Sequence, residues 1–374
     1  MSTQPPPTPQ RIAIPSDLIV PATSVSIPLH LFPVPGKPGE YKVGIVVAAK
    51  DSAGNTQDAR MYEFDTGGQG FWMEASPGLP VPSPADCTLS ILYASGIEYS
   101  AAPQLLTLAF PESSATADAS HLSTQAVVGV VREIVPYAKA PDEVPEQKKF
   151  PIFGQFYGDF GAALQGFSQT PGAPPSLLTV LAQLPAPYNN GFIVDVGPYP
   201  GGDSSTSAPG QLIVGLTPQL RALFTSQVAM IPATPYLPST GGSPIDTFQE
   251  AAITATLAVG TAGNAGGIGV VFDTGAPTTE IHEGKVVTPG PFAPVKGETL
   301  SLVPTTPASF SILDYVIGTT PGVDLAQSTG VNVLLIEDGY INTGLNPFFQ
   351  SQVMFDLANG AIGFPNTLFN QPAP

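Results

Sequence analysis

One short motif occurs twice in this chain of 374 residues and constrains its fold more than any other feature. Phe64-Asp65-Thr66-Gly67 returns as Phe272-Asp273-Thr274-Gly275, and each copy follows an apolar run. A carboxylate at the end of a buried strand, followed by glycine, lies on a tight turn with its side chain free to face a cleft. The repeat therefore predicts two similar halves that each contribute one carboxylate to a shared site.

Two carboxyl groups held close together have a specific chemistry. They cannot both ionise cheaply, so one stays protonated while the other is charged. The charged member can deprotonate a water molecule while the protonated member gives its proton to a carbonyl oxygen. A pair formed by Asp65 and Asp273 is thus suited to hydrolysis without a covalent intermediate.

The composition favours a packed chain built from short strands. Hydrophobic residues make up 43% of the chain and charged residues only 11%, which is unlike a disordered protein. The 44 prolines and 39 glycines are too many for long helices but suit strands joined by turns. The predicted fold class is therefore all-β, and the single cysteine means that no internal disulfide supports it.

Several other classes of protein are disfavoured. The net charge of −17 would repel nucleic acid and anionic membranes, and no apolar run is long enough to span a bilayer. Residues 1–17 do not resemble a signal peptide. His30, His121 and His282 lie far apart without metal-ligand spacing, so neither a metal nor a cofactor is expected. The Gly-rich run over 263–269 precedes a strand and is interpreted as a loop, not a dinucleotide site.

The chain is expected to divide into a Pro-rich linker over residues 1–17, a first β lobe over 18–205 and a second β lobe over 206–374. Each lobe contains one Asp-Thr-Gly, and the whole plan of strands repeats between them. Short helices are expected near 177–184 and 308–317. Strands are expected at residues 26–31, 41–49, 59–64, 88–93, 105–110, 127–135, 192–196, 211–215, 251–259, 269–272, 331–336 and 352–357.

Three further segments accompany the repeated motif. Trp72 follows the first copy, Tyr93-Ala94-Ser95-Gly96 comes later in the same lobe, and residues 344–364 contain Phe-Asp followed by Ile-Gly-Phe. With these features the chain, over roughly residues 38–366, resembles the pepsin-like aspartic proteases. The Pro/Gly-rich context and the missing disulfides look more narrowly like the aspartic protease domains of mycobacterial PE-family surface proteins.

The resemblance implies a bilobal pepsin-like acid protease fold with a cleft between pseudo-symmetric lobes, in which Asp65 and Asp273 share one proton and hold the attacking water. It implies that the hydroxyls of Thr66 and Thr274 bond to the backbone of the opposite turn. Gly67 and Gly275 would leave room for a peptide backbone.

The same resemblance implies a flap that closes over the substrate. Tyr93, Ala94, Ser95 and Gly96 would form its tip, with the tyrosine covering the bound peptide. Trp72 would hold that tyrosine through its indole N–H. The simpler alternatives are that Trp72 is a core aromatic residue and Tyr93 an ordinary strand residue.

Some positions depart from the family pattern. The residue after each triplet, usually a serine or threonine that donates to the aspartate, is Gly68 or Ala276. Fewer donors to the charged form should raise the pKa values of the pair. Alanine replaces a flap glycine at Ala94. Asn342-Thr343 occupies the place of an apolar pair before Gly344, whereas Ile152-Phe153-Gly154 is interpreted as the conforming first-lobe counterpart.

The predicted function is an aspartic endopeptidase that cleaves extended peptides and binds pepstatin-like inhibitors, and a monomer is expected. The resemblance implies an extracellular or cell-surface setting, with secreted PE-type proteins, including its own precursor, as substrates. One alternative is a catalytically silent, protease-like binding or adhesion module. Another is a protease so narrowly specific that generic substrates show no cleavage.

Overall fold

The computed structural model describes most of the chain and consists almost entirely of β-strands. The described residues are 10–75, 77–93, 96–136, 149–170, 173–200, 210–238, 241–260, 263–283, 297–307, 309–316, 331–335 and 339–365. Strands account for 44% and helices for 6%, so the predicted all-β class is confirmed. The short helices are η1 (Ser16–Leu18), η3 (Val180–Gln183), α1 (Pro218–Ala222) and α2 (Asn346–Gln350). No helix in the described ranges is long and apolar enough to cross a bilayer.

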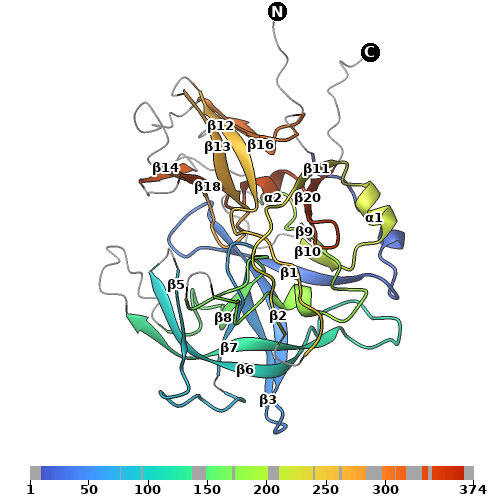
Figure 1. Ribbon diagram of the computed structural model, residues 1–374, viewed down its shortest axis with the longest axis vertical. Coiled ribbons are helices and arrows are strands. Elements are labelled where there is room, and N and C mark those ends of the chain that lie inside the picture. Colours follow the sequence, from blue (N-terminus) through green and yellow to red (C-terminus); the bar gives the residue numbers. More distant parts are fainter. Residues whose placement is uncertain are drawn as a thin grey trace, which may run out of the picture.

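The first lobe is a ring of strands closed on itself, drawn in blue to green in Figure 1. Its hydrogen-bonded order is β2-β3-β8-β4-β7-β6, and a further pairing between β6 and β2 closes the ring, with β5 beside β6. Closure leaves few unpaired strand edges. The strands are β2 (Tyr41–Lys50), β3 (Thr56–Asp65), β4 (Phe71–Glu74), β5 (Leu89–Leu92), β6 (Ile97–Ala109), β7 (Ser123–Pro136) and β8 (Gly158–Gly161).

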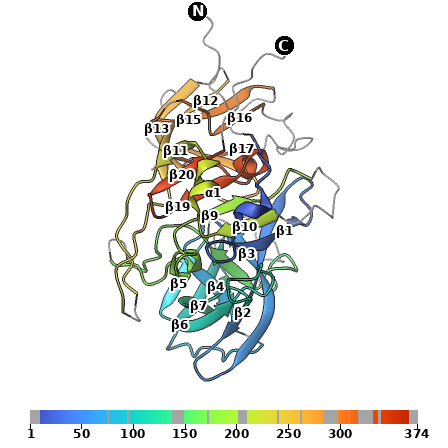
Figure 2. The ribbon, with the colours of Figure 1, turned by 90° about the vertical axis from the view of Figure 1, so that its right-hand side faces the viewer.

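A middle layer joins segments from the beginning, centre and end of the chain. Its order is β1-β10-β9-β19-β20-β11, and Figures 1 and 2 both show it between the two ends of the molecule. Strand β1 pairs with β10 through its first half and with β2 through its second, so this layer is continuous with the first lobe. The strands are β1 (Val25–Pro33), β9 (Phe192–Asp195), β10 (Gly210–Val214), β11 (Ser226–Ala229), β19 (Val353–Asp356) and β20 (Ala361–Phe364).

The second lobe is a separate seven-stranded sheet with the order β16-β15-β12-β13-β18-β14-β17. Side chains along β12 are buried at every second position, which is the period expected of a half-buried strand. The strands are β12 (Ile253–Val259), β13 (Gly263–Val271), β14 (Thr279–Glu283), β15 (Thr299–Pro304), β16 (Leu313–Val316), β17 (Val331–Leu335) and β18 (Tyr340–Asn342).

Each aspartate-bearing strand lies beside one parallel strand from later in its own lobe. In the first lobe β3 pairs with β8, so that Glu63 is opposite Asp159. In the second lobe β13 pairs with β18, so that Val271 is opposite Asn342. Glu63 and Val271 each lie two residues before an aspartate of the repeated motif. Asp159 and Asn342 therefore occupy equivalent positions in the two lobes.

The structure corrects three sequence-based expectations. The helix expected near 308–317 is replaced by β16 in its described part, because Leu300 and Leu302 of β15 pair with this segment across a buried sheet. The Gly-rich run over 263–269 forms part of β13 and is not a loop. The strand beside β3 is Gly158–Gly161, so Ile152-Phe153-Gly154 was the wrong counterpart of the second-lobe segment.

The two lobes and the middle layer bury one continuous hydrophobic core. It includes Phe64 and Phe160 from the first lobe, Phe272 from the second and Phe355 from the middle layer. Phe64 stacks on Phe160 with ring centroids 6.1 Å apart, while Phe272 meets Phe355 edge-on at 6.5 Å. The phenylalanine before each aspartate therefore anchors its turn in the core.

A buried ion pair fastens α1 to the middle layer and gives a test of the fold. Arg221 donates Nε to Asp356 Oδ2 at 2.7 Å and Nη2 to Asp356 Oδ1 at 3.0 Å, and the Asp356 side chain is only 1% exposed. We expect Arg221→Ala to lower the free energy of unfolding by about 3 kcal/mol, because it leaves a buried charge without its partner. Denaturant titration measures the loss.

Lys37→Ala is the matched control for Arg221→Ala. Lys37 pairs with Glu40 at 3.5 Å, and its side chain is 56% exposed. Removing this surface pair should cost less than about 1 kcal/mol. Equal losses in the two variants would contradict the role assigned to Arg221.

Candidate active site

The two Asp-Thr-Gly turns meet where β3 and β13 end. Asp65 is the last residue of β3, and Asp273 follows β13 after Phe272. A Cβ atom built on Gly67 would lie 2.6 Å from Asp273 Cγ, and one built on Gly275 would overlap the Asp65 carboxyl. Each carboxyl thus lies against the glycine of the opposite turn, and neither glycine has room for a side chain.

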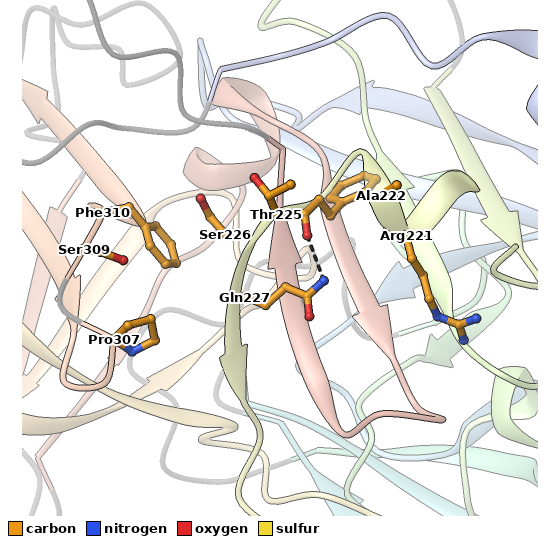
Figure 3. A pocket seen from close by; sticks show the side chains of 9 residues that line it. Arg221, Ala222, Thr225, Ser226, Gln227, Pro307, Ser309 and Phe310 are labelled. Carbon is orange, nitrogen blue, oxygen red and sulfur yellow. Dashed lines mark hydrogen bonds between the residues drawn. The ribbon is translucent and has the colours of Figure 1, made fainter. Parts of the chain in front are cut away.

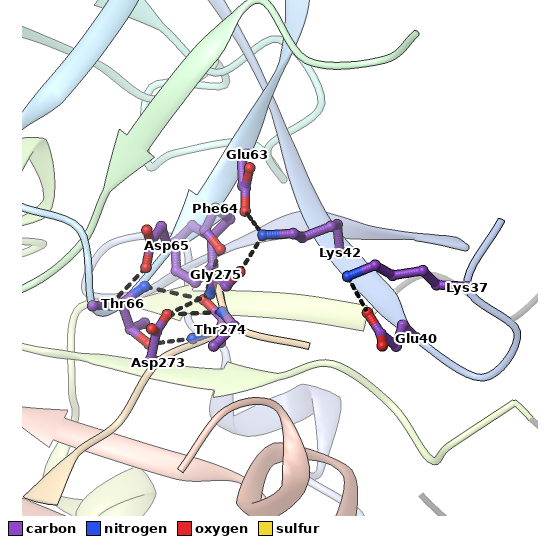
Figure 4. Close-up of polar contacts among 12 residues, drawn as sticks. Lys37, Glu40, Lys42, Glu63, Phe64, Asp65, Thr66, Asp273, Thr274 and Gly275 are labelled. Carbon is purple, nitrogen blue, oxygen red and sulfur yellow. Dashed lines mark hydrogen bonds and ion pairs between the residues drawn. The ribbon is translucent and has the colours of Figure 1, made fainter. Parts of the chain in front are cut away.

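The threonines of the two turns bind each other's backbone reciprocally, as Figure 4 shows. Thr66 Oγ1 donates to the Phe272 carbonyl at 2.7 Å, and Thr274 Oγ1 donates to the Phe64 carbonyl at 2.6 Å. The backbone N–H of each threonine donates to the hydroxyl of the other, both at 3.0 Å. These are the bonds between opposite turns that the resemblance implies. Both side chains are buried.

Backbone N–H groups hold the inner oxygen of each aspartate. The N–H of Gly67 donates to Asp65 Oδ1 at 2.8 Å. Asp273 Oδ1 accepts from Gly275 at 2.6 Å and from Ala276 at 3.1 Å. Such donors stabilise negative charge on a carboxylate and fix its plane.

The outer oxygen of Asp273 is bound by a side chain from the neighbouring strand. Asn342 Nδ2 donates to Asp273 Oδ2, and Asn342 Oδ1 accepts from the Gly344 N–H at 3.0 Å. The sequence departure at Asn342 therefore replaces the donor that is missing at Ala276. The expected shortage of donors applies to Asp65 and does not extend to Asp273.

Asp159 is a third carboxyl group in the site, and the sequence analysis missed it. It lies on β8 and is only 5% exposed. Its Oδ1 and Asp65 Oδ2 lie 3.2 and 2.7 Å from the point where a Gly68 Cβ would be. The one signal in the sequence was an acidic residue between Gly158 and the apolar run Phe160-Gly161-Ala162.

A buried ion pair lies beside the carboxyl groups, as Figure 4 shows. Lys42 Nζ, from β2, donates to Glu63 Oε1 at 2.6 Å and also to the Gly275 carbonyl of the opposite lobe. Burial by itself would lower the pKa of Lys42, but the charge and hydrogen bond of Glu63, together with the charges of Asp65 and Asp273, outweigh it and the pKa is raised. The lysine therefore stays charged, with its charge balanced locally by Glu63.

Burial is the main influence on the protonation of Asp65. Its side chain is only 7% exposed, whereas Asp273 is partly exposed. Burial first, and then the negative charges of Asp273 and Asp159, raise the pKa of Asp65 well above its ordinary value. Asp65 is thus the member of the pair that keeps a proton more readily.

The described part of the predicted flap is a tight turn between β5 and β6. The Gly96 N–H donates to the Tyr93 carbonyl at 2.9 Å, and Gly96 has a positive φ of 84°. Ala94 and Ser95 lie outside the described residues. The Tyr93 ring packs against Tyr99 with centroids 5.5 Å apart.

The expected bond from Trp72 to Tyr93 is wrong. The Trp72 indole N–H donates instead to the Gln69 carbonyl at 2.7 Å. Trp72 is fully buried and meets Phe167 edge-on at 4.9 Å, so it has the core role weighed as its alternative. The Tyr93 hydroxyl is buried and makes no hydrogen bond within the described part of the chain.

The described residues contain no group of three or more His, Cys, Asp or Glu side chains placed to hold a metal ion. His30 pairs with Glu112 at 2.7 Å, and His121 contacts the Ser113 carbonyl at 3.0 Å. The side chain of His282 is outside the described part.

A pocket of about 540 Å³ lies away from the carboxyl groups, between α1, β11 and the loop before β16. Figure 3 shows Arg221 at one side and Phe310 at the other, with Gln227 bonded to the Phe224 carbonyl at 2.8 Å. The guanidinium of Arg221 is already paired with Asp356. The pocket shares no residue with the candidate active site.

The likeness of this chain to known proteins is structural. Neither a protein-family model nor a curated protein matches the sequence. The crystal structure of basic 7S globulin from soybean matches with a TM-score of 0.50 and 14% identity, covering 93% of this chain and 98% of that chain. The chain has the pepsin-like bilobal fold. At this identity the likeness concerns the pepsin-like fold alone, so the activity has to be argued from the site.

The reciprocal threonine bonds give a second prediction. Thr66→Val keeps the shape of the side chain but leaves the Phe272 carbonyl and the Thr274 N–H buried without a partner. We expect a loss of about 2 kcal/mol in the free energy of unfolding. Thr66→Ser keeps the hydroxyl and should lose less than about 1 kcal/mol. Calorimetry of both variants measures this, and equal losses would mean that the hydroxyl is not what stabilises the turns.

Proposed function

We propose that this protein is an aspartic endopeptidase. The observation that carries the proposal is the pair of aspartates on reciprocally bonded turns, each carboxyl lying over the glycine of the other. A protein that only binds a partner has no physical need for two facing carboxyl groups that repel each other when ionised.

The surroundings of the two aspartates support a different role for each. Asp273 is partly exposed, and the Gly275 and Ala276 N–H groups and the Asn342 amide donate to it, so it is suited to carry the negative charge. Asp65 is buried and has a raised pKa, so it is suited to hold the shared proton.

The proposed reaction has two steps. A water molecule attacks the peptide carbonyl carbon while Asp273 takes its proton and Asp65 gives its own proton to the carbonyl oxygen, which forms a neutral gem-diol. In the second step Asp273 returns the proton to the leaving nitrogen, and Asp65 recovers a proton as the carbonyl re-forms and the C–N bond breaks. The pair ends in its starting state.

The proposed substrates are extended peptides, bound largely through their backbone. Gly67 and Gly275 are partly exposed and carry no side chain, so a peptide backbone can approach both carboxyl groups. The sequence resemblance further supports a secreted or cell-envelope protease that acts on PE-type surface proteins, including its own precursor.

The dyad is tested by Asp65→Asn and Asp273→Asn, each of which removes one acid–base group from the reaction. We expect each to lower cleavage of a randomised peptide pool by at least about 10³-fold. Asp17→Asn, at an exposed position outside the site, makes the same chemical change and should leave the rate unaltered.

Pepstatin binding separates the alternatives. Binding without cleavage of the pool would indicate a narrowly specific protease. A folded wild type that neither cleaves nor binds pepstatin would refute the proposal in favour of a binding module.

The pH profile gives an independent test. Because the pKa of Asp65 is raised, its proton is retained to higher pH, and the singly ionised pair forms at less acidic pH than in pepsin. We therefore expect the kcat/KM profile to reach its maximum well above about pH 3. A maximum below that value, measured on a fluorogenic peptide, would contradict this reasoning.

A further inference from the structure

The position of Asp159 is the starting point of the inference. Strand β8 lies between β3 and β4, and its register sets Asp159 opposite Glu63 and Trp72. The equivalent residue of the second lobe, Asn342, donates its amide to the outer oxygen of Asp273. Asp159 therefore stands where the first lobe would have the donor to Asp65.

Gly68 makes room for this arrangement. Asp65 Oδ2 and Asp159 Oδ1 both border the space that a Gly68 side chain would fill, at 2.7 and 3.2 Å from its Cβ position. Asp159 Oδ1 is buried and has no hydrogen-bond partner within the described residues. A buried polar oxygen without a partner is costly, so this oxygen is a candidate to carry or share a proton.

No ion pair between described residues involves Asp159. Lys42, a cation among the described residues near Asp159, lowers the pKa of Asp159, but it already binds Glu63 and the Gly275 carbonyl and forms no ion pair with Asp159. The tyrosines that face the cluster can donate hydrogen bonds but supply no positive charge. The titratable groups around Asp159 are Lys42 of β2, Glu63 and Asp65 of β3, Tyr93 of the flap turn, Tyr99 of β6 and Asp273 of the second lobe.

We propose that Asp159 is a positioning residue that holds a proton of its own and donates it as a hydrogen bond to the outer oxygen of Asp65, as Asn342 does for Asp273. This proposal rests on the proposed protease function for its catalytic meaning. The active site would then contain three carboxyl groups, two protons and one negative charge.

The pKa shifts agree with two protons and one negative charge on the three carboxyl groups. Burial, and then the Glu63 charge, raise the pKa of Asp159 well above its ordinary value, while the nearby Tyr93 hydroxyl and the Lys42 charge act more weakly in the opposite direction. Burial, and then the Asp159 charge, raise the pKa of the Tyr93 hydroxyl as well. An ionised Asp159 would repel charge on Asp65, whereas a protonated Asp159 can donate to Asp65 and leave its second oxygen to accept from the neutral Tyr93 hydroxyl.

The first test is the pH profile of cleavage by Asp159→Asn. Asparagine keeps a neutral donor of the same shape, so kcat at the optimum should stay within about threefold of wild type, with KM unchanged. Asp159 is a second group through which the wild-type cluster can lose a proton as pH rises. Its removal should therefore move the alkaline limb upward, by up to about one pH unit, and leave the acidic limb in place.

Asp159→Leu tests whether residue 159 acts as a hydrogen-bond donor or only fills space. Leucine fills the space but donates nothing, so kcat should fall by about tenfold or more, while Asp159→Asn retains it. If Asp159 were instead ionised over the whole pH range, its negative charge would raise the pKa values of Asp65 and Asp273. Its replacement by asparagine would then shift both limbs downward, which would overturn the proposal, as would an unchanged profile.

The second test needs no cleavage. An acid whose pKa is raised in the folded state contributes stability that is full below its unfolded pKa and is lost as pH rises through its folded pKa. The melting temperatures of wild type and Asp159→Asn should therefore agree near about pH 4. As pH rises toward about pH 8, the melting temperature of the variant should increase relative to that of the wild type.

Peptide cleavage and melting temperature distinguish failure of the Asp159 proposal from failure of the proposed protease function. If the melting temperatures diverge as expected but no peptide is cleaved, Asp159 holds its proton and the protease function fails. If the variant is instead less stable than wild type at neutral pH, Asp159 is ionised in the folded protein and the proposal is wrong, whatever the activity.

Discussion

The reciprocal bonds between Thr66 and Thr274 are the interaction on which the site depends. Each lobe supplies half of the dyad, and a carboxyl group has catalytic value only when its partner lies within reach. The two hydroxyls and two backbone N–H groups form a closed set of four hydrogen bonds, at 2.6 to 3.0 Å, between turns that belong to different sheets. Phe64 and Phe272, whose carbonyls accept these bonds, are themselves buried in the common core.

The strands beside the turns decide the electrostatics of the aspartates. Gly68 and Ala276 offer no hydroxyl to the outer oxygens, so side chains from β8 and β18 approach them instead. In the second lobe that side chain is an amide, which favours a charged partner. In the first lobe it is a carboxyl, which favours a charged partner only while it is protonated. Two lobes with the same backbone plan thus place different groups, an amide and a carboxyl, beside their aspartates.

The sequence was sufficient to predict the features that repeat or alternate. Two copies of Phe-Asp-Thr-Gly identified the turns, and the apolar runs over 41–49 and 251–259 gave strands close to those observed. It could not identify which strand lies beside β3, because Ile152-Phe153-Gly154 matches the expected pattern better than the segment that pairs there. Parallel pairing is set by long-range contacts, and a local pattern does not encode it.

The short elements show the same limit. Leu313–Val316 has a sequence compatible with a helix, and it becomes a strand because the edge of β15 is available to it. Asp159 was missed for a related reason, since an acidic residue in a short strand acquires meaning only when its neighbours are known. The indole of Trp72 likewise finds the Gln69 carbonyl three residues away, a local bond that no resemblance between families would reveal.

The pairing of Lys42 with Glu63 explains how a cation can lie beside the dyad without removing its proton. A buried ammonium near two carboxyl groups would stabilise both in their ionised form and leave no acid for catalysis. Glu63 accepts from Lys42 at 2.6 Å and balances that charge, while the same ammonium also binds the Gly275 carbonyl of the opposite lobe. Lys42 therefore adds a link between the lobes, and its charge interacts most strongly with Glu63 and more weakly with Asp65 and Asp273. The carboxyl cluster remains short of positive charge, which is the condition under which its protons are retained.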